Sequence, residues 1–106
     1  MSGNGGGSGP SYSEMEEDCS NVRFRTHLSS PVPEVVAELQ VGDTLAVKYQ
    51  PPRGPLYAQT SMGNKAGSIV TGEQVTLINC ISKGYSYKAE VIKLAGGKCE
   101  LEIKPV

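Results

Sequence analysis

Lysine, arginine and tyrosine side chains offer the clearest chemistry in this sequence. A tyrosine ring gives a nucleic-acid base a flat face on which to stack, and a lysine or arginine attracts a phosphate. Together these groups could contact a single-stranded nucleic acid. The candidates are Arg23, Arg25, Lys48, Tyr49, Arg53, Tyr57, Lys65, Tyr85 and Lys88.

The same side chains are also ordinary parts of a folded protein. A buried tyrosine packs its ring in the core and turns its hydroxyl to a hydrogen-bond partner. Arg23, Arg25 and His27 alternate with apolar residues, so their face of a strand could simply be solvated or could keep a sheet edge soluble. Both explanations stay open. His27, the sole histidine, is expected to be structural because no second ligand or nucleophile is adjacent to it in the sequence.

Catalytic and metal-binding patterns are absent from the sequence of 106 residues. It has no glycine-rich phosphate loop, no metal-ligand spacing of His, Cys and Asp, and no Ser-His or Cys-His signal. No stretch approaches the roughly 18 consecutive apolar residues of a membrane span. We therefore expect a protein that is not an enzyme and that uses no cofactor, no metal and no membrane.

Charge and cysteine content indicate the expected environment. All ten lysines and arginines follow residue 20, whereas four of the eleven acidic residues precede it, so the later part is mildly basic. The three cysteines, Cys19, Cys80 and Cys99, match neither a zinc motif nor a disulfide framework. We expect Cys80 and Cys99 to be free buried thiols and the protein to be cytoplasmic.

Composition divides the chain near residue 20. Residues 1–20 are rich in glycine and serine and carry only acidic charges, which predicts a disordered arm. Residues 21–106 are long enough for one modest core and are expected to form a single β-barrel domain.

The segment from Tyr85 to Pro105 is the element around which the others must pack. Apolar and polar residues alternate on both sides of a Gly-Gly pair, which predicts a β-hairpin. The two apolar faces coincide only if Val91 lies opposite Leu101. A three-residue loop, Ala95-Gly96-Gly97, gives this register and a two-residue turn does not, so we predict the longer loop.

Shorter elements are expected before this hairpin. Alternation predicts strands at residues 21–29 and 44–49 and a second hairpin at 56–70 that reverses at Gly63-Asn64. A single helical turn is expected after the prolines near residue 33. Gly67, inside the second hairpin, indicates a bulge or a close approach of two backbones.

One segment is ambiguous between helix and strand. As a helix, Glu73 to Lys83 would follow an N-cap at Thr71 and stop at Gly84. As a strand, its β-branched residues would alternate. We favour the helix because both end signals fit and Ile78 breaks the alternation.

These elements predict a mainly β fold. About six short strands with one or two short helices describe a small curved antiparallel barrel, SH3-like or OB-like, because few-stranded sheets close to remove their edges. A β-sandwich is the alternative.

The sequences AGSI, KGYSYKAEV and LAGGKCELEI follow one another between Tyr57 and Ile103. In this order they resemble the HIRAN domain, and the Arg-x-Pro-x-Asn-x-x-Asp-x-x-Ala stretch of that family is absent here. HIRAN domains bind DNA, particularly single-stranded 3′ ends, so the resemblance implies a small DNA-binding domain. Its most specific residues are Gly67, Ile69, Gly84, Tyr87, Ala89 and Val91.

We therefore predict a non-enzymatic binding module that contacts single-stranded nucleic acid, DNA in particular, through a basic, tyrosine-bearing face. The alternative is a protein-interaction or inhibitory module whose partner docks on a sheet edge or on the loop from Gln50 to Pro55. The near-neutral total charge slightly favours that alternative over nucleic acid.

Overall fold

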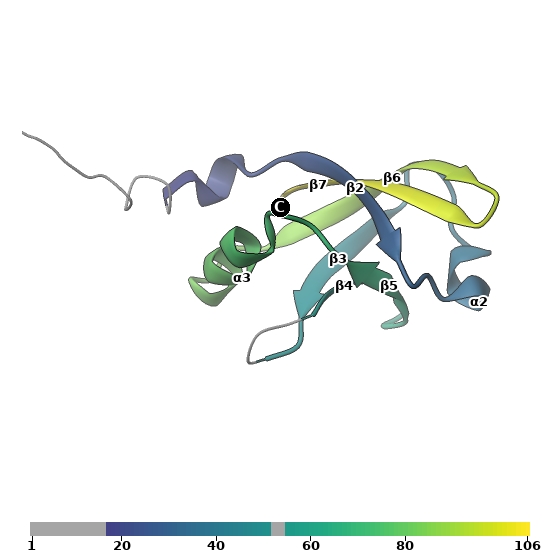
Figure 1. Ribbon diagram of the computed structural model, residues 1–106, viewed down its shortest axis with the longest axis horizontal. Coiled ribbons are helices and arrows are strands. Elements are labelled where there is room, and N and C mark those ends of the chain that lie inside the picture. Colours follow the sequence, from purple (N-terminus) through teal and green to yellow (C-terminus); the bar gives the residue numbers. More distant parts are fainter. Residues whose placement is uncertain (1–16, 52–54) are drawn as a thin grey trace, which may run out of the picture.

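Six antiparallel strands close into a barrel in this computed structural model, which describes residues 17–51 and 55–106. The strands are β2 (Phe24–Ser29), β3 (Thr44–Tyr49), β4 (Leu56–Gln59), β5 (Lys65–Ile69), β6 (Tyr87–Ala95) and β7 (Lys98–Pro105). Their order around the barrel is β2-β5-β4-β3-β6-β7, and Figure 1 labels each strand. The predicted small antiparallel barrel is confirmed.

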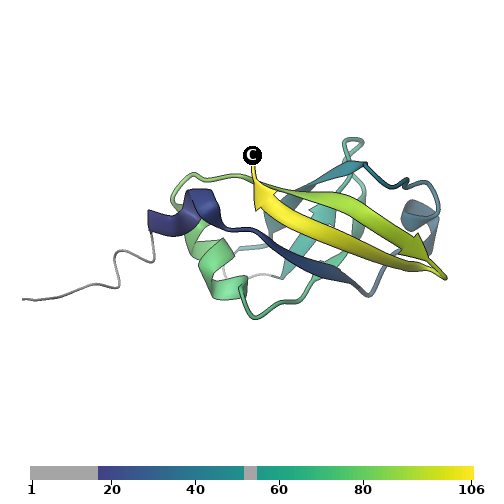
Figure 2. The ribbon, with the colours of Figure 1, turned by 90° about the horizontal axis from the view of Figure 1, so that it is seen from above.

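Among the described residues, three helical segments lie at the two ends of the barrel. They are the 3-10 turn η1 (Glu17–Asn21) and the helices α2 (Pro33–Val36) and α3 (Gln74–Ser82). Both views show η1 beside α3 at one end, with α2 near the tip of the β6–β7 hairpin at the other (Figures 1 and 2). Because α3 spans Gln74–Ser82, the ambiguous segment from Glu73 to Lys83 is a helix, as favoured from the sequence.

The start of α3 differs from the expectation. Its N-cap is Glu73, and the hydroxyl of Thr71 accepts a hydrogen bond from the Glu73 amide (3.1 Å) in a turn that precedes the helix. The predicted stop is confirmed, because Gly84 has a positive φ of 105° immediately after the last turn.

Alternate residues of the strands fill the barrel interior. Leu45 and Val47 of β3 are buried, as are Val91 of β6 and Leu101 of β7, while their neighbours in sequence face outward. Leu77 of α3 is fully buried and closes one end of this core. The core is mainly aliphatic, with Tyr87 and three cysteines, and the described polar and charged residues of the strands are not buried.

The β6–β7 hairpin has the predicted facing residues but a different turn. Val91 pairs with Leu101 as predicted, yet Ala95 pairs with Lys98, so the turn consists of two residues, Gly96 and Gly97. The register shift between Val91 and Lys93 reconciles the two observations. A bulge adds one residue to β6 and turns its apolar face back to the core. The predicted three-residue loop is therefore wrong.

Gly67 lies where two backbone segments meet closely, as predicted. A Cβ at this position would lie 3.1 Å from the carbonyl oxygen of Ser29 and 3.2 Å from the Cα of Pro31. The β4–β5 register also shifts between Ala58 and Gln59, next to this glycine. The contact lets the chain leaving β2 pass tightly over β5.

Cysteine pairing is the main departure from expectation. Cys19 and Cys80 form a disulfide with a Cα–Cα distance of 5.6 Å, so the prediction of a free thiol at Cys80 is wrong. Cys99 is free and buried, as predicted. Cys19 is only 1% exposed and η1 spans the expected boundary at residue 20, so the core includes this part of the chain. Of the expected arm at residues 1–20, residues 1–16 lie outside the described residues.

Candidate nucleic-acid interface

A groove opens where β3 and β6 separate. Their ladder ends at the pair Ala46–Lys88, although β3 continues to Tyr49 and the chain before β6 continues back to Tyr85. The diverging strands leave a hollow of about 480 Å³ between them, which we name the β3–β6 groove. It is lined by Thr44, Leu45, Ala46, Val47, Lys48, Tyr49, Gln59, Thr60, Ser61, Ile81, Tyr85, Ser86, Tyr87, Lys88 and Val106.

Four of the predicted site residues line this groove. Lys48 and Tyr49 come from the end of β3, and Tyr85 and Lys88 come from the other side of the opening. Ala46, between Lys88 on one neighbouring strand and Gln59 on the other, carries only a methyl group and so leaves space between longer side chains.

The outer face of β4 and β5 extends this surface. Tyr57 pairs with Lys48 across the β3–β4 ladder, and the ammonium of Lys65 lies 5.4 Å from the centroid of the Tyr57 ring. This cation–π contact covers one face of a half-buried ring. A base stacking there would compete with Lys65 and release its charge for a phosphate.

Tyr85 and Tyr49 differ in how far their side chains are exposed. Tyr85 is 42% exposed. Tyr49 is half-buried, and its hydroxyl lies 3.3 Å from the hydroxyl oxygen of Ser82, at the end of α3. This contact orients the Tyr49 ring at the rim of the groove. Tyr49 thus contacts α3 and also lines the groove, so both the packing and the binding explanation stay open for it.

The structure separates two arginines from the other candidates. Arg23 and Arg25 are exposed, but β2 lies three strands from β3 in either direction around the barrel. Arg25 also pairs with Glu102 of β7. Neither arginine lines the β3–β6 groove, and a role for them in binding stays a prediction. Arg53 lies outside the described residues.

The groove is positively charged. Among the described residues that line it, Lys48 and Lys88 are charged and none is acidic. The nearest carboxylate along β6, that of Glu90, accepts a hydrogen bond from Lys104, and this contact and the lysine charge lower the pKa of Glu90. Lys104 is thus the main partner of this carboxylate, and the charge of Lys88 in the groove also lowers its pKa.

Sequence reasoning missed several lining residues. Gln59 alternates with buried Leu56 and Ala58 on β4, a pattern that could have indicated its outward position. Ile81 and Val106 had no such signal, because α3 and the C-terminus reach the groove only through tertiary packing. The amide of Val106 donates to the carbonyl of Ser86 (3.0 Å) and so fixes the C-terminus at the rim.

Within residues 17–51 and 55–106, no three His, Cys, Asp or Glu side chains gather closely enough to hold a metal ion. No helix in the same residues is long and apolar enough to span a membrane.

Comparison with known proteins supports the fold alone. No protein family matches the chain, and no curated protein matches it. A crystal structure of a protein from Lactobacillus plantarum, a structural genomics target, is similar, with a TM-score of 0.57 and 17% sequence identity. The match covers 77% of this chain and 95% of that one.

Proposed function

We propose that this protein is a non-enzymatic binding module that holds a single-stranded nucleic acid in the β3–β6 groove. The observation that carries the proposal is the meeting of Lys48, Tyr49, Tyr85 and Lys88 around one hollow, with Tyr57 and Lys65 adjoining. Bases stack on tyrosine rings without regard to sequence, and lysines neutralise the phosphates between them. The resemblance to the HIRAN domain supports the same ligand.

The groove suits a single strand better than a duplex. Its aromatic residues require unpaired bases with open faces, which a duplex does not provide. The charged side chains that the structure describes in it are two lysines, Lys48 and Lys88, instead of an extended basic face, so binding depends on stacking as well as on charge.

Fluorescence anisotropy tests this proposal. A labelled oligonucleotide of about 10 nucleotides should bind as a single strand, more weakly as a duplex, and less tightly as salt rises. RNA of the same sequence shows whether the sugar matters. Absence of binding at low salt would refute the proposal.

Variants on the two sides of the barrel test whether the ligand binds in the groove. Lys48→Ala with Lys88→Ala should reduce the slope of log affinity against log salt by about 1.4, because each single-strand phosphate contact contributes about 0.7. Tyr85→Ala should weaken binding by about tenfold through the loss of one stacked base. Arg25→Ala is the matched control, since it removes an exposed cation from the opposite side of the barrel. An equal effect of Arg25→Ala would contradict the assignment of the groove.

A protein ligand is the second candidate, and one observation favours it. The β3–β6 ladder stops at Ala46 although β3 continues to Tyr49, so an extended peptide could pair with the last residues of β3. The loop of residues 50–55 is described only in part. Selection from a random-peptide display library, with and without oligonucleotide as competitor, separates the two ligands, because a peptide that pairs with β3 would be displaced by an oligonucleotide in the groove.

A further inference from the structure

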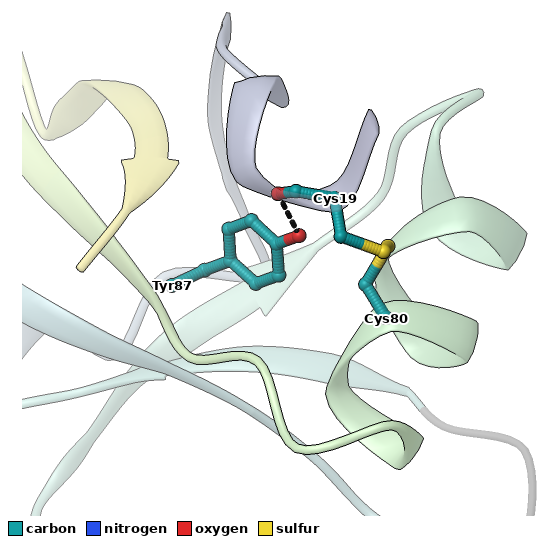
Figure 3. Close-up of a disulfide and its surroundings, with 3 residues drawn as sticks. All are labelled: Cys19, Cys80 and Tyr87. Atoms are coloured by element: carbon teal, nitrogen blue, oxygen red, sulfur yellow. Dashed lines mark hydrogen bonds between the residues drawn. A yellow bond between two sulfur atoms is a disulfide. The ribbon is translucent and has the colours of Figure 1, made fainter. Parts of the chain in front are cut away.

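The Cys19–Cys80 disulfide joins two segments that are far apart in the sequence. It links η1 to α3 across a separation of 61 residues, and the two cysteines are 1% and 2% exposed. Figure 3 shows the crosslink between the two helical segments, with the ring of Tyr87 beside it. The bond is thus an internal connection of the barrel end that carries α3.

Both half-cystines contact the wall of the β3–β6 groove. The hydroxyl of Tyr87 donates a hydrogen bond to the carbonyl of Cys19 (Figure 3). The amide of Tyr85 donates to the carbonyl of Cys80 at 3.1 Å. Tyr85 and Tyr87 both line the groove. The two carbonyls next to the disulfide therefore hold two tyrosines of the same wall.

The last turn of α3 adds a third connection. Ile81 follows Cys80 directly and lines the groove, and Ser82 contacts the hydroxyl of Tyr49 on the opposite side of the opening. A change in the position of α3 relative to η1 would thus reach both sides of the groove.

We propose that the Cys19–Cys80 disulfide is a redox-sensitive clamp that holds the groove in its binding conformation. This inference rests on the proposed function, because it concerns regulation of the same site. With the disulfide formed, Tyr85 and Tyr87 are fixed before the ligand arrives, and a preordered site loses less conformational entropy on binding. With the disulfide reduced, η1 can leave α3, and Tyr87 loses its acceptor.

A dithiol reductant opens the clamp. One thiolate of the reductant attacks a sulfur of the disulfide, and its second thiol resolves the mixed disulfide. Two electrons and two protons pass to the protein, so Cys19 and Cys80 become thiols and the reductant becomes a disulfide. Because both half-cystines are buried, attack requires a local opening of the chain around the intact bond that exposes one of its sulfurs.

The test compares oligonucleotide binding in the two redox states. The labelled single strand is titrated with oxidised protein, with protein reduced by dithiothreitol, and with the Cys19→Ser/Cys80→Ser variant. We expect affinity to fall by about tenfold in both forms without the disulfide, within the usual range for coupling between two sites. Cys99→Ala is the control, since Cys99 is free and lies outside the crosslink. Equal affinity in the oxidised and reduced forms would overturn the clamp.

A second measurement needs no ligand. Hydrogen exchange of the Tyr85 amide, whose acceptor is the carbonyl of Cys80, should accelerate by about tenfold on reduction, at temperatures where the barrel stays folded. If oxidised protein binds no oligonucleotide but this exchange responds to reduction, the proposed function fails and the clamp stands as a conformational device. If the exchange does not respond, the clamp is refuted whatever the ligand.

Tyr87→Phe separates the clamp from general stability. It keeps the buried ring and the disulfide and removes only the hydroxyl that reaches Cys19. We expect binding to weaken by about threefold, the effect of one net hydrogen bond, in the oxidised form and little further effect in the reduced form. Equal weakening in both forms would show that the hydroxyl acts independently of the clamp.

Discussion

Lys104 organises the charges on the outer face beside the groove. Its ammonium donates to Oε1 of Glu90 and lies 4.0 Å from Oε1 of Glu102. The hydrogen bond first, and the lysine charge second, lower the pKa of Glu90 from its ordinary value. The folded chain therefore binds this proton less tightly than the unfolded chain does. The resulting stability is present above the ordinary pKa and is lost as the pH falls through the lowered one.

The Lys104→Met variant tests this pair. We expect the pKa of Glu90 to rise toward its ordinary value, since both the donor and the positive charge are removed. The measurement is an NMR titration of the Glu90 side-chain carboxyl carbon. Lys93→Met removes an exposed lysine from β6, the strand that carries Glu90. It should leave the titration midpoint of Glu90 nearly unchanged. An unchanged midpoint in Lys104→Met would contradict the contact, whose effect on stability is small because both groups are partly exposed.

At the scale of elements, the β6–β7 hairpin shows how a turn and a bulge together set a register. Gly96 and Gly97 have φ values of 59° and 82°, as a two-residue type I′ turn requires. That turn alone would place the two apolar faces on opposite sides. The bulge between Val91 and Lys93 corrects the phase, so Val91 and Leu101 share the core.

Substitution of Gly96 distinguishes this turn from a three-residue loop. Gly96→Ala should destabilise the protein by about 1–2 kcal/mol, because alanine is disfavoured at positive φ. Gly96→Asn should be nearly neutral, since asparagine tolerates this conformation and Asn-Gly is favoured in such turns. Urea unfolding measures both. In a three-residue loop Gly96 would have a negative φ, so a neutral Gly96→Ala variant would favour that loop.

At the scale of the whole molecule, the disulfide ties η1 to the rest of the domain. It closes a loop of 61 residues and lies against the core through Cys19 and Cys80. Such bonds are typical of oxidising compartments, and the cytoplasmic location that the sequence suggested stays a prediction.

Unfolding with and without dithiothreitol measures the contribution of the crosslink. We expect the reduced protein to be less stable by about 2–5 kcal/mol, mainly because its unfolded chain regains conformational freedom. Thiol titration in denaturant without reductant should detect one thiol, that of Cys99, whose pKa is raised by burial in the folded state. Three thiols would show that the bond is absent, and an unchanged urea midpoint on reduction would show that it does not stabilise the fold.

Local patterns were enough to predict most elements. Alternation placed Leu45 and Val47 on one face of β3, and the stop at Gly84 ended α3, because strand faces and helix ends depend on neighbouring residues. The same patterns predicted that Lys48 and Tyr57 lie on strands, with Lys48 exposed and Tyr57 half-buried in the structure.

The tertiary structure decided which of these residues meet. Barrel closure puts β2 opposite β3, so Arg25 is separated from Lys48 although both occupy exposed strand positions. The partner of Cys19 could not be read from sequence, because a separation of 61 residues says nothing about distance in space. Periodicity along one strand determines the side to which a residue points, and only closure of the sheet determines what lies on that side.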